Sequence, residues 1–128
     1  MGRSKPLSQT TMNQATEELQ RNLCAKYGVE FIGCAPGSKV GLALSTLGRV
    51  PINGLRHPPT ADSNGWYIWA GEWSTKADFF APLHTFHLEE QLPQVLEFLG
   101  LAPGSRFLLA DDHVDVWFDK ALLNVDSE

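Results

Sequence analysis

The sequence has 128 residues, with 10 Lys or Arg against 15 Asp or Glu, and its formal net charge is −5. That length allows one hydrophobic core and leaves little room for a second. The hydrophobic fraction of 43% and the charged fraction of 20% are those of globular proteins, which excludes disordered and fibrous classes. No apolar run approaches the roughly 20 residues of a membrane-spanning helix, and no apolar stretch typical of a secretion signal follows the N-terminus. We therefore expect a single-domain cytoplasmic protein that does not contact a membrane.

The charge is distributed unevenly along the chain. Residues 1–64 contain seven Lys or Arg and four Asp or Glu, whereas residues 65–128 contain three and eleven. The balance is therefore +3 in the first half and −8 in the second. An acidic surface repels the phosphates of nucleic acids and attracts basic proteins. We expect no nucleic-acid partner, and either a basic protein partner or an acidic surface that serves solubility alone.

The first predicted elements are a tail and a helix. Residues 1–10 are polar and show no periodicity, so we expect a disordered tail and a single domain over 11–128. Thr11 and Gln14 fit a capping box, in which each side chain satisfies a free backbone N–H. The apolar stripe that follows, at three- and four-residue steps, predicts an amphipathic helix over 11–27.

Two short strands and a long loop are predicted next. Residues 29–35 and 39–45 have the composition of strands, are separated by the turn pair Pro36-Gly37, and are expected to pair as a hairpin. Residues 46–64 contain several Pro and Gly and show little periodicity, which predicts an irregular loop. Long loops in compact domains are often functional.

The second half predicts a central strand, two helices and a hairpin. Residues 65–71 are apolar or aromatic on both faces, which is typical of a strand covered on both sides. Helical spacing over 88–99 is interrupted by Pro93, so two short helices are expected. Residues 106–110 and 114–118 predict the last two strands. The order of elements predicts an α+β fold: a largely antiparallel sheet of about five strands, with the N-terminal helix and the central helical pair packed on it.

Residues that could carry chemistry form no recognisable catalytic or metal-binding pattern. His84 and His87 lie three residues apart, but the spacing of Cys24 and Cys34 matches no zinc site. Cys34 could form a nucleophilic arrangement with a histidine and an acid, although chance alone offers such combinations in a chain of this size. The glycines form no phosphate-binding motif. We therefore expect no metal, no cofactor and no enzymatic activity.

Three tryptophans occur within eight residues, at Trp66, Trp69 and Trp73. In a strand, Trp66 and Ile68 lie on one face and Tyr67 and Trp69 on the other. If both faces are covered, all of these side chains belong to the core. If one face is open, Tyr67 and Trp69 become anchors for a partner, since large aromatic residues dominate interface energetics.

Several motifs together resemble a known family. They are Lys39-Val40-Gly41, Asn64-Gly65-Trp66-Tyr67-Ile68-Trp69-Ala70-Gly71-Glu72, the stretch from Leu92-Pro93 to Leu99, and Gly104-Ser105-Arg106-Phe107. Over about residues 32–118 they resemble the Imm33 and Imm33-like immunity proteins. Two further stretches, 54–59 and 115–119, look more like the Imm33-like subgroup. The helix over 11–27 would then be an addition to the shared domain.

The resemblance implies a bacterial protein that neutralises a toxin domain by binding it directly. Together with the acidic second half, it leads us to expect a partner-binding surface for a basic toxin domain. We expect this surface to contain Trp69, Glu72, Asp111, Asp112 and Asp115.

Two other hypotheses remain open. In the first, the chain is a small-molecule-binding or enzymatic domain with a pocket walled by the loop 46–64. Arg56 and His57 would contact an anionic ligand there, and Trp66 or Trp69 would stack on it. In the second, a hydrophobic edge of the protein mediates self-association.

Overall fold

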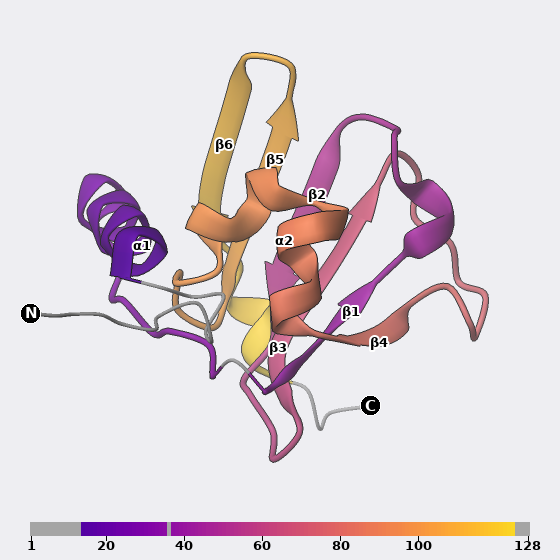
Figure 1. Cartoon of the computed structure of the whole chain (residues 1–128), viewed down its shortest axis with the longest axis horizontal. Helices are drawn as coiled ribbons and strands as arrows, with labels where there is room; N and C mark the ends of the chain where they lie inside the picture. The colour runs from indigo at the N-terminus through magenta and orange to yellow at the C-terminus, as the bar shows by residue number, and fades with distance from the viewer. Residues whose placement is uncertain (1–13, 36, 125–128) are drawn as a thin grey trace, which may run out of the picture.

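The computed structural model describes residues 14–35 and 37–124, which form an α+β fold around one six-stranded mixed sheet (Figure 1). The strand order is β4-β1-β3-β2-β5-β6. The strands are β1 (Lys39–Leu42), β2 (Ile52–Arg56), β3 (Ser63–Ala70), β4 (Ala81–His84), β5 (Ser105–Ala110) and β6 (His113–Phe118). β1 and β3 run parallel, and the other neighbouring pairs are antiparallel. The predicted fold class is confirmed, with six strands rather than about five.

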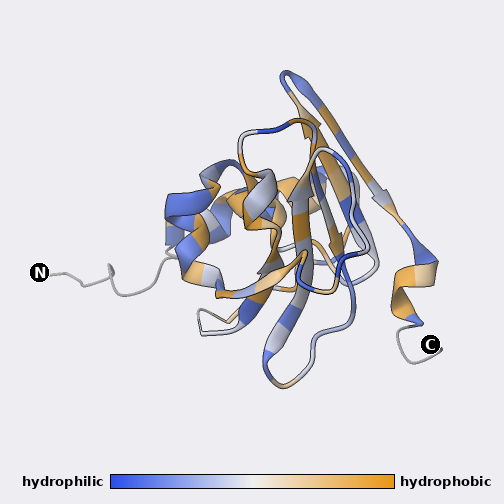
Figure 2. Ribbon diagram, turned by 90° about the vertical axis from the view of Figure 1, so that its right-hand side faces the viewer, coloured by the Kyte–Doolittle hydropathy of each residue, from blue (hydrophilic) through white to orange (hydrophobic). Residues whose placement is uncertain are grey.

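The helices lie on both faces of this sheet. They are α1 (Gln14–Tyr27), α2 (Leu88–Gln91) and the 3-10 helices η2 (Leu44–Thr46), η3 (Thr85–His87), η4 (Pro93–Phe98) and η5 (Lys120–Leu123). Figures 1 and 2 show α2 and η4 over one face, with α1 beside η4, and η5 against the opposite face. We call these the helix face and the η5 face. The predicted pair of short helices on either side of Pro93 is confirmed, and Pro93 occupies the first turn of η4, where its missing N–H costs nothing.

β3 is the central element, as residues 65–71 predicted. Trp66, Ile68 and Ala70 point to the helix face and are buried in the main hydrophobic core with residues of α2 and η4. Tyr67 and Trp69 point to the η5 face and pack in a second cluster with Leu122 and with Phe79 and Phe80. Both faces of the strand are therefore covered, and its aromatic residues supply much of the buried area that a domain of this size needs.

The predicted hairpin over 29–45 is wrong. Within residues 29–35, Phe31 forms an isolated bridge to Leu101, and no regular strand is present. The segment 39–42 instead lies between β3 and β4. This placement buries Val40 and Leu42 in the main core and gives the segment a paired strand on each side. The predicted tail at residues 1–10 and the cap residue Thr11 lie outside the described residues.

The predicted irregular loop over 46–64 is also wrong, because it contains β2. Asn53-Gly54 has the composition of a turn, yet both residues lie inside the strand. Gly54 is required there because the ring of Phe107 crosses it: a Cβ on Gly54 would lie 2.3 Å from that ring. The glycine therefore marks a close approach between neighbouring side chains and backbone rather than a turn.

Candidate functional site

Arg56 is a buried cation that holds three segments together. Its side chain is 1% exposed and donates hydrogen bonds to the carbonyl oxygens of Ile32 at 2.6 Å, Asn64 at 2.8 Å and Leu101 at 2.8 Å. No carboxylate pairs with it in the described parts of the chain. Burial lowers the pKa of the Arg56 guanidinium, although an arginine stays charged in proteins. The backbone carbonyls thus take the place of an acidic partner.

The structure separates the three residues of the predicted pocket. Arg56 and the fully buried Trp66 lie on the helix face, where the guanidinium carbon is 5.6 Å from the tryptophan ring. His57, the next residue along the chain, contacts the η5 face: its ring meets Tyr67 edge-on at 5.6 Å, and its Nδ1 lies 2.9 Å from the carbonyl oxygen of Leu122. Arg56, His57 and Trp66 therefore do not face one cavity.

Both cysteines lie close to Arg56 without forming a reactive site. The Cys34 thiol donates to the carbonyl oxygen of Leu99 and lies 3.7 Å from a guanidinium nitrogen, while Cys24 donates to the carbonyl oxygen of Gly100. Burial raises the pKa of both thiols, and the nearby Arg56 charge opposes this shift without reversing it. A nucleophilic cysteine requires a lowered pKa, so the environment of Cys34 favours an inert thiol.

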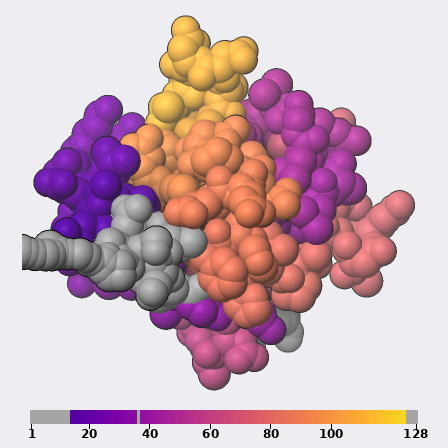
Figure 3. Space-filling view, in the orientation of Figure 1, coloured from indigo at the N-terminus to yellow at the C-terminus, as the bar shows by residue number. Residues whose placement is uncertain are grey.

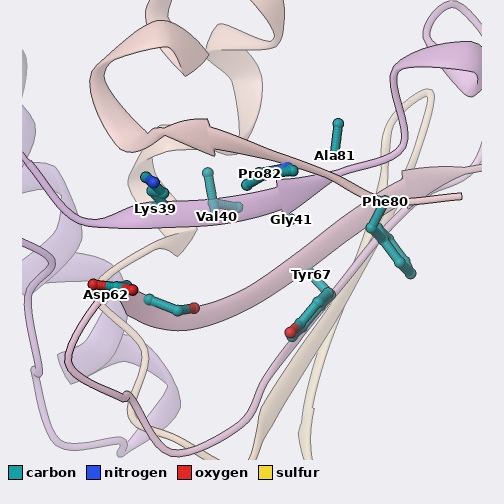
Figure 4. A pocket seen from close by; sticks show the side chains of 9 residues that line it. Lys39, Val40, Gly41, Asp62, Tyr67, Phe80, Ala81 and Pro82 are labelled. Carbon is teal, nitrogen blue, oxygen red and sulfur yellow. The ribbon is translucent and has the colours of Figure 1, made fainter. Parts of the chain in front are cut away.

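A pocket of about 320 Å³ lies between β1, β3 and β4 (Figure 4). It forms where the pairing of β1 with β3 shifts, since Lys39 pairs with Ser63 but Gly41, two residues later, pairs with Tyr67. In Figure 4, Lys39 and Asp62 stand at one end and the rings of Tyr67 and Phe80 at the other. Of the loop expected to wall a pocket, Asp62 and Ser63 line this one.

A second feature of the η5 face is a row of side chains that crosses four strands. The register pairs Trp69 with Asn53, Asn53 with Leu108, and Leu108 with Asp115. Residues paired across strands point to the same face, so Trp69 and Asp115 share one surface three strand spacings apart, or roughly 14 Å. Asp115 is exposed and Leu108 is half-buried.

The remaining predicted residues lie at the end of the same strands. Ile52 of β2 pairs with both Ala70 and Leu109, which aligns the ends of β3 and β5. Glu72 follows Ala70 by two residues, and Asp111 follows Leu109 by two residues, with Asp112 directly after it. The three residues therefore lie at the same end of the sheet. All three carboxylates are exposed, and Figure 3 shows the β5–β6 hairpin projecting from the top of the molecule.

Trp73 supplies the exposed aromatic surface beside this row. Its ring contacts Trp69 edge-on at 4.8 Å and Phe80 at 5.4 Å, yet 51% of its surface remains exposed. Trp69 itself is only 6% exposed. We use the name acidic–aromatic surface for Glu72, Trp73, Leu108, Asp111, Asp112 and Asp115, with Trp69 beneath Trp73. Asp111 stands at the border of this surface, because it also lines a pocket of the helix face with Ile52 and Val114.

Sequence reasoning missed Trp73 and Leu108 in this surface. Trp73 belongs to the tryptophan group that the sequence shows, but it follows the strand, and its ring position depends on the fold of residues 71–80. Leu108 could have been found, because a two-residue turn at Asp111-Asp112 fixes the register of the hairpin and places Leu108 opposite Asp115.

Among residues 14–35 and 37–124, no three His, Cys, Asp or Glu side chains gather closely enough to hold a metal ion. In the same part of the chain, no helix combines the length and the apolar character needed to cross a bilayer.

The fold and surface define a small α+β domain with a central tryptophan-rich strand, a buried arginine and an acidic end. The family model of the Imm33-like domain matches residues 19–119, and the chain belongs to that family. The resemblance over about residues 32–118 is thereby confirmed. The match begins inside α1, so the family's domain includes residues 19–27 of this helix, and the helix as a whole is not an addition to it. No curated protein and no solved structure matches the chain.

Proposed function

We propose that this protein is a cytoplasmic, non-enzymatic immunity protein that neutralises a basic bacterial toxin domain by binding it through the acidic–aromatic surface. The observation that carries the proposal is the cross-strand row. This row places Trp69 and Asp115, which are far apart in the sequence, on one face of the sheet. The ends of the strands add the carboxylates of Glu72, Asp111 and Asp112 and the exposed Trp73. Membership of the Imm33-like family supports a role in immunity.

The two kinds of residue have different tasks in this mechanism. The carboxylates of Glu72, Asp111, Asp112 and Asp115 attract a basic domain and raise the association rate, an effect that salt screens. The Trp73 ring, supported from below by Trp69, offers a rigid apolar anchor that loses water when the partner docks. Bound in this way, the protein blocks the toxin by covering its surface.

The small-molecule hypothesis has less support. An anionic ligand needs a free cation, whereas the donors of Arg56 already bond backbone carbonyls. The pocket of Figure 4 contains Lys39, but the exposed Asp62 lies in the same lining and opposes the binding of an anion. These placements favour a protein partner over a small ligand.

The proposal is tested by capture and rescue. The tagged protein is incubated with lysate of the source organism at low and at moderate salt, and bound proteins are identified by mass spectrometry. We expect a basic protein that is retained at low salt and depleted at moderate salt. Expressed alone in a host cell, the captured protein should stop growth, and co-expression with this chain should restore it.

A matched pair of charge variants locates the surface. The variant Asp111→Asn, Asp112→Asn, Asp115→Asn removes three carboxylates from the acidic–aromatic surface, and its association rate should fall about tenfold or more. The control Glu18→Gln, Glu89→Gln, Glu90→Gln removes the same charge from exposed positions on α1 and α2, and it should bind nearly as the parent does. Equal binding of both variants, or capture of an acidic protein that salt does not release, would contradict the proposal.

A further inference from the structure

The two edges of the sheet differ in how well they are protected. One edge is β4, a four-residue strand with Pro82 inside it, and a proline on an edge strand blocks the addition of another strand. The other edge is β6, which pairs with β5 over six residues without a bulge and contains no proline or glycine. β6 therefore lacks the proline and the bulge that protect other edge strands.

The backbone groups that β6 leaves free can be assigned from its pairing. The two-residue turn is closed by the pair Ala110–His113, and the N–H of Asp119 donates to the carbonyl oxygen of Gly104 at 2.7 Å. In an antiparallel pair, alternate residues face the neighbouring strand, so residues 113, 115 and 117 bond β5. The N–H and C=O groups of Val114, Val116 and Phe118 consequently point away from the sheet, and in the described part of the chain no hydrogen bond satisfies them.

The side chains of the free edge are apolar to a degree unusual for an exposed strand. Val114 is 45% exposed, Trp117 42% and Phe118 60%. Val114 and Phe118 share the helix face with Val116, which packs against the main core. Trp117 points to the η5 face, beside Arg106. An edge with free backbone groups and an apolar face is a template for another strand.

The sequence of β6 is compatible with a second copy of β6 as the added strand, in one particular register. Geometry allows two copies of β6 to pair antiparallel only in registers that place outward-facing residues opposite each other. With the twofold axis at Val116, Val114 faces Phe118 of the second copy, so the helix-face positions match apolar with apolar. In the same register Asp115 faces Trp117 of the second copy, so no two carboxylates stand opposite each other within the paired strands. With the axis at Asp115, two aspartates face each other, and like charges in direct opposition destabilise a sheet.

We propose that the protein forms a homodimer in which the two β6 strands pair antiparallel about a twofold axis at Val116, so that a twelve-stranded sheet runs through both copies. This axis is perpendicular to the sheet, and the two acidic–aromatic surfaces therefore face the same side. The dimer presents them as a pair, which suits a partner with two basic patches or two copies of a partner. The dimer does not depend on the identity of the toxin.

The first test is the mass in solution, measured by light scattering and sedimentation over a range of concentrations. The chain mass is 14.2 kDa, and we expect twice that value at high concentration. In Val114→Pro one outward N–H is removed while the bonds to β5 remain, and the dissociation constant of the dimer should rise at least about tenfold. The control Val114→Thr keeps the N–H and should dimerise as the parent does. A monomer at every concentration, or a dimer that Val114→Pro leaves intact, would overturn the proposal.

Cysteine cross-linking tests the register without a proline. Two Cα atoms in a hydrogen-bonded antiparallel pair lie about 5.5 Å apart, within the range of a disulfide. Val116→Cys should therefore form a disulfide-linked dimer under mild oxidation, while the native cysteines stay buried or half-buried. Asp115→Cys, displaced from the axis, should link far more slowly. The reverse order of the two variants, or no link in either, would refute the pairing about Val116 even if the chain still binds a toxin.

Discussion

Replacing Arg56 by methionine removes a buried cation while keeping most of the side-chain volume. The change deletes three short hydrogen bonds from a charged donor, of which two are buried and one is partly buried, and three carbonyls lose this partner. Each such bond contributes about 1.5–3 kcal/mol, and relief from burying the charge offsets part of the sum. We expect Arg56→Met to lower the free energy of unfolding by about 3–5 kcal/mol.

Urea denaturation followed by tryptophan fluorescence measures this change, with an unchanged m-value as evidence that the unfolded state is not altered. Arg106→Met is the control. Arg106 lies on the neighbouring strand and pairs with Asp119 at 3.0 Å in a partly exposed ion pair, so its loss should cost about 1 kcal/mol or less. If the two variants lose the same stability, or if Arg56→Met loses under about 1 kcal/mol, the carbonyl cluster is not what holds these segments together.

Three further predictions concern the core, a glycine and a thiol. Trp69→Ala should lower the free energy of unfolding by about 3–5 kcal/mol, because its ring is buried. Trp73→Ala should leave the free energy of unfolding within about 1 kcal/mol of the parent and weaken partner capture, because its ring is exposed. Urea denaturation and partner capture measure the two effects, and the opposite ranking would contradict the assignment of Trp73 as the exposed anchor. Gly54→Ala should lower the free energy of unfolding by about 1–3 kcal/mol in the same assay, because the added Cβ meets the ring of Phe107. The control Gly37→Ala has open space around its Cβ and should leave the free energy of unfolding unchanged. Equal effects of the two variants would refute the close approach of Phe107 to Gly54. Burial raises the pKa of the Cys34 thiol, so as the pH rises the unfolded chain loses the thiol proton before the folded chain does. The free energy of unfolding is therefore retained below the usual thiol pKa of about 8.5 and declines as the pH rises above that value. Cys34→Ala should flatten this decline in urea titrations, and an unchanged decline would argue against the raised pKa of the Cys34 thiol.

Local patterns in the sequence were sufficient for the elements that depend on neighbouring residues. The strand at 65–71 is apolar on both faces, Pro93 interrupts a helical stripe, and residues 111–113 separate two strand-like segments. Each feature acts within a few residues of itself, through the alternation of a strand, the missing N–H of proline or the conformation of a tight turn. These predictions correspond to β3, to the α2–η4 pair and to the β5–β6 hairpin.

Predictions that required a distant partner were less successful. Gly54 has the composition of a turn, and nothing near it in the sequence shows that Phe107 will cross it. Arg56, next to a histidine in a region of prolines, resembles a ligand-binding residue, but its donors bond carbonyls contributed by residues 32, 64 and 101. In both cases, contact with a remote segment overrides the local propensity.

The sequence by itself determined the family, the fold class, the aromatic central strand and the concentration of acidic residues in the second half. Only the tertiary structure decided which of these residues share a surface, because the register of β2, β3, β5 and β6 places Trp69 and Asp115 in one row. It also decided that Trp73 is exposed while Trp69 is covered, and that β6 rather than β4 is the open edge. The physical reason is that composition and periodicity describe which surface a segment can bury, whereas strand order and register determine what each segment is buried against.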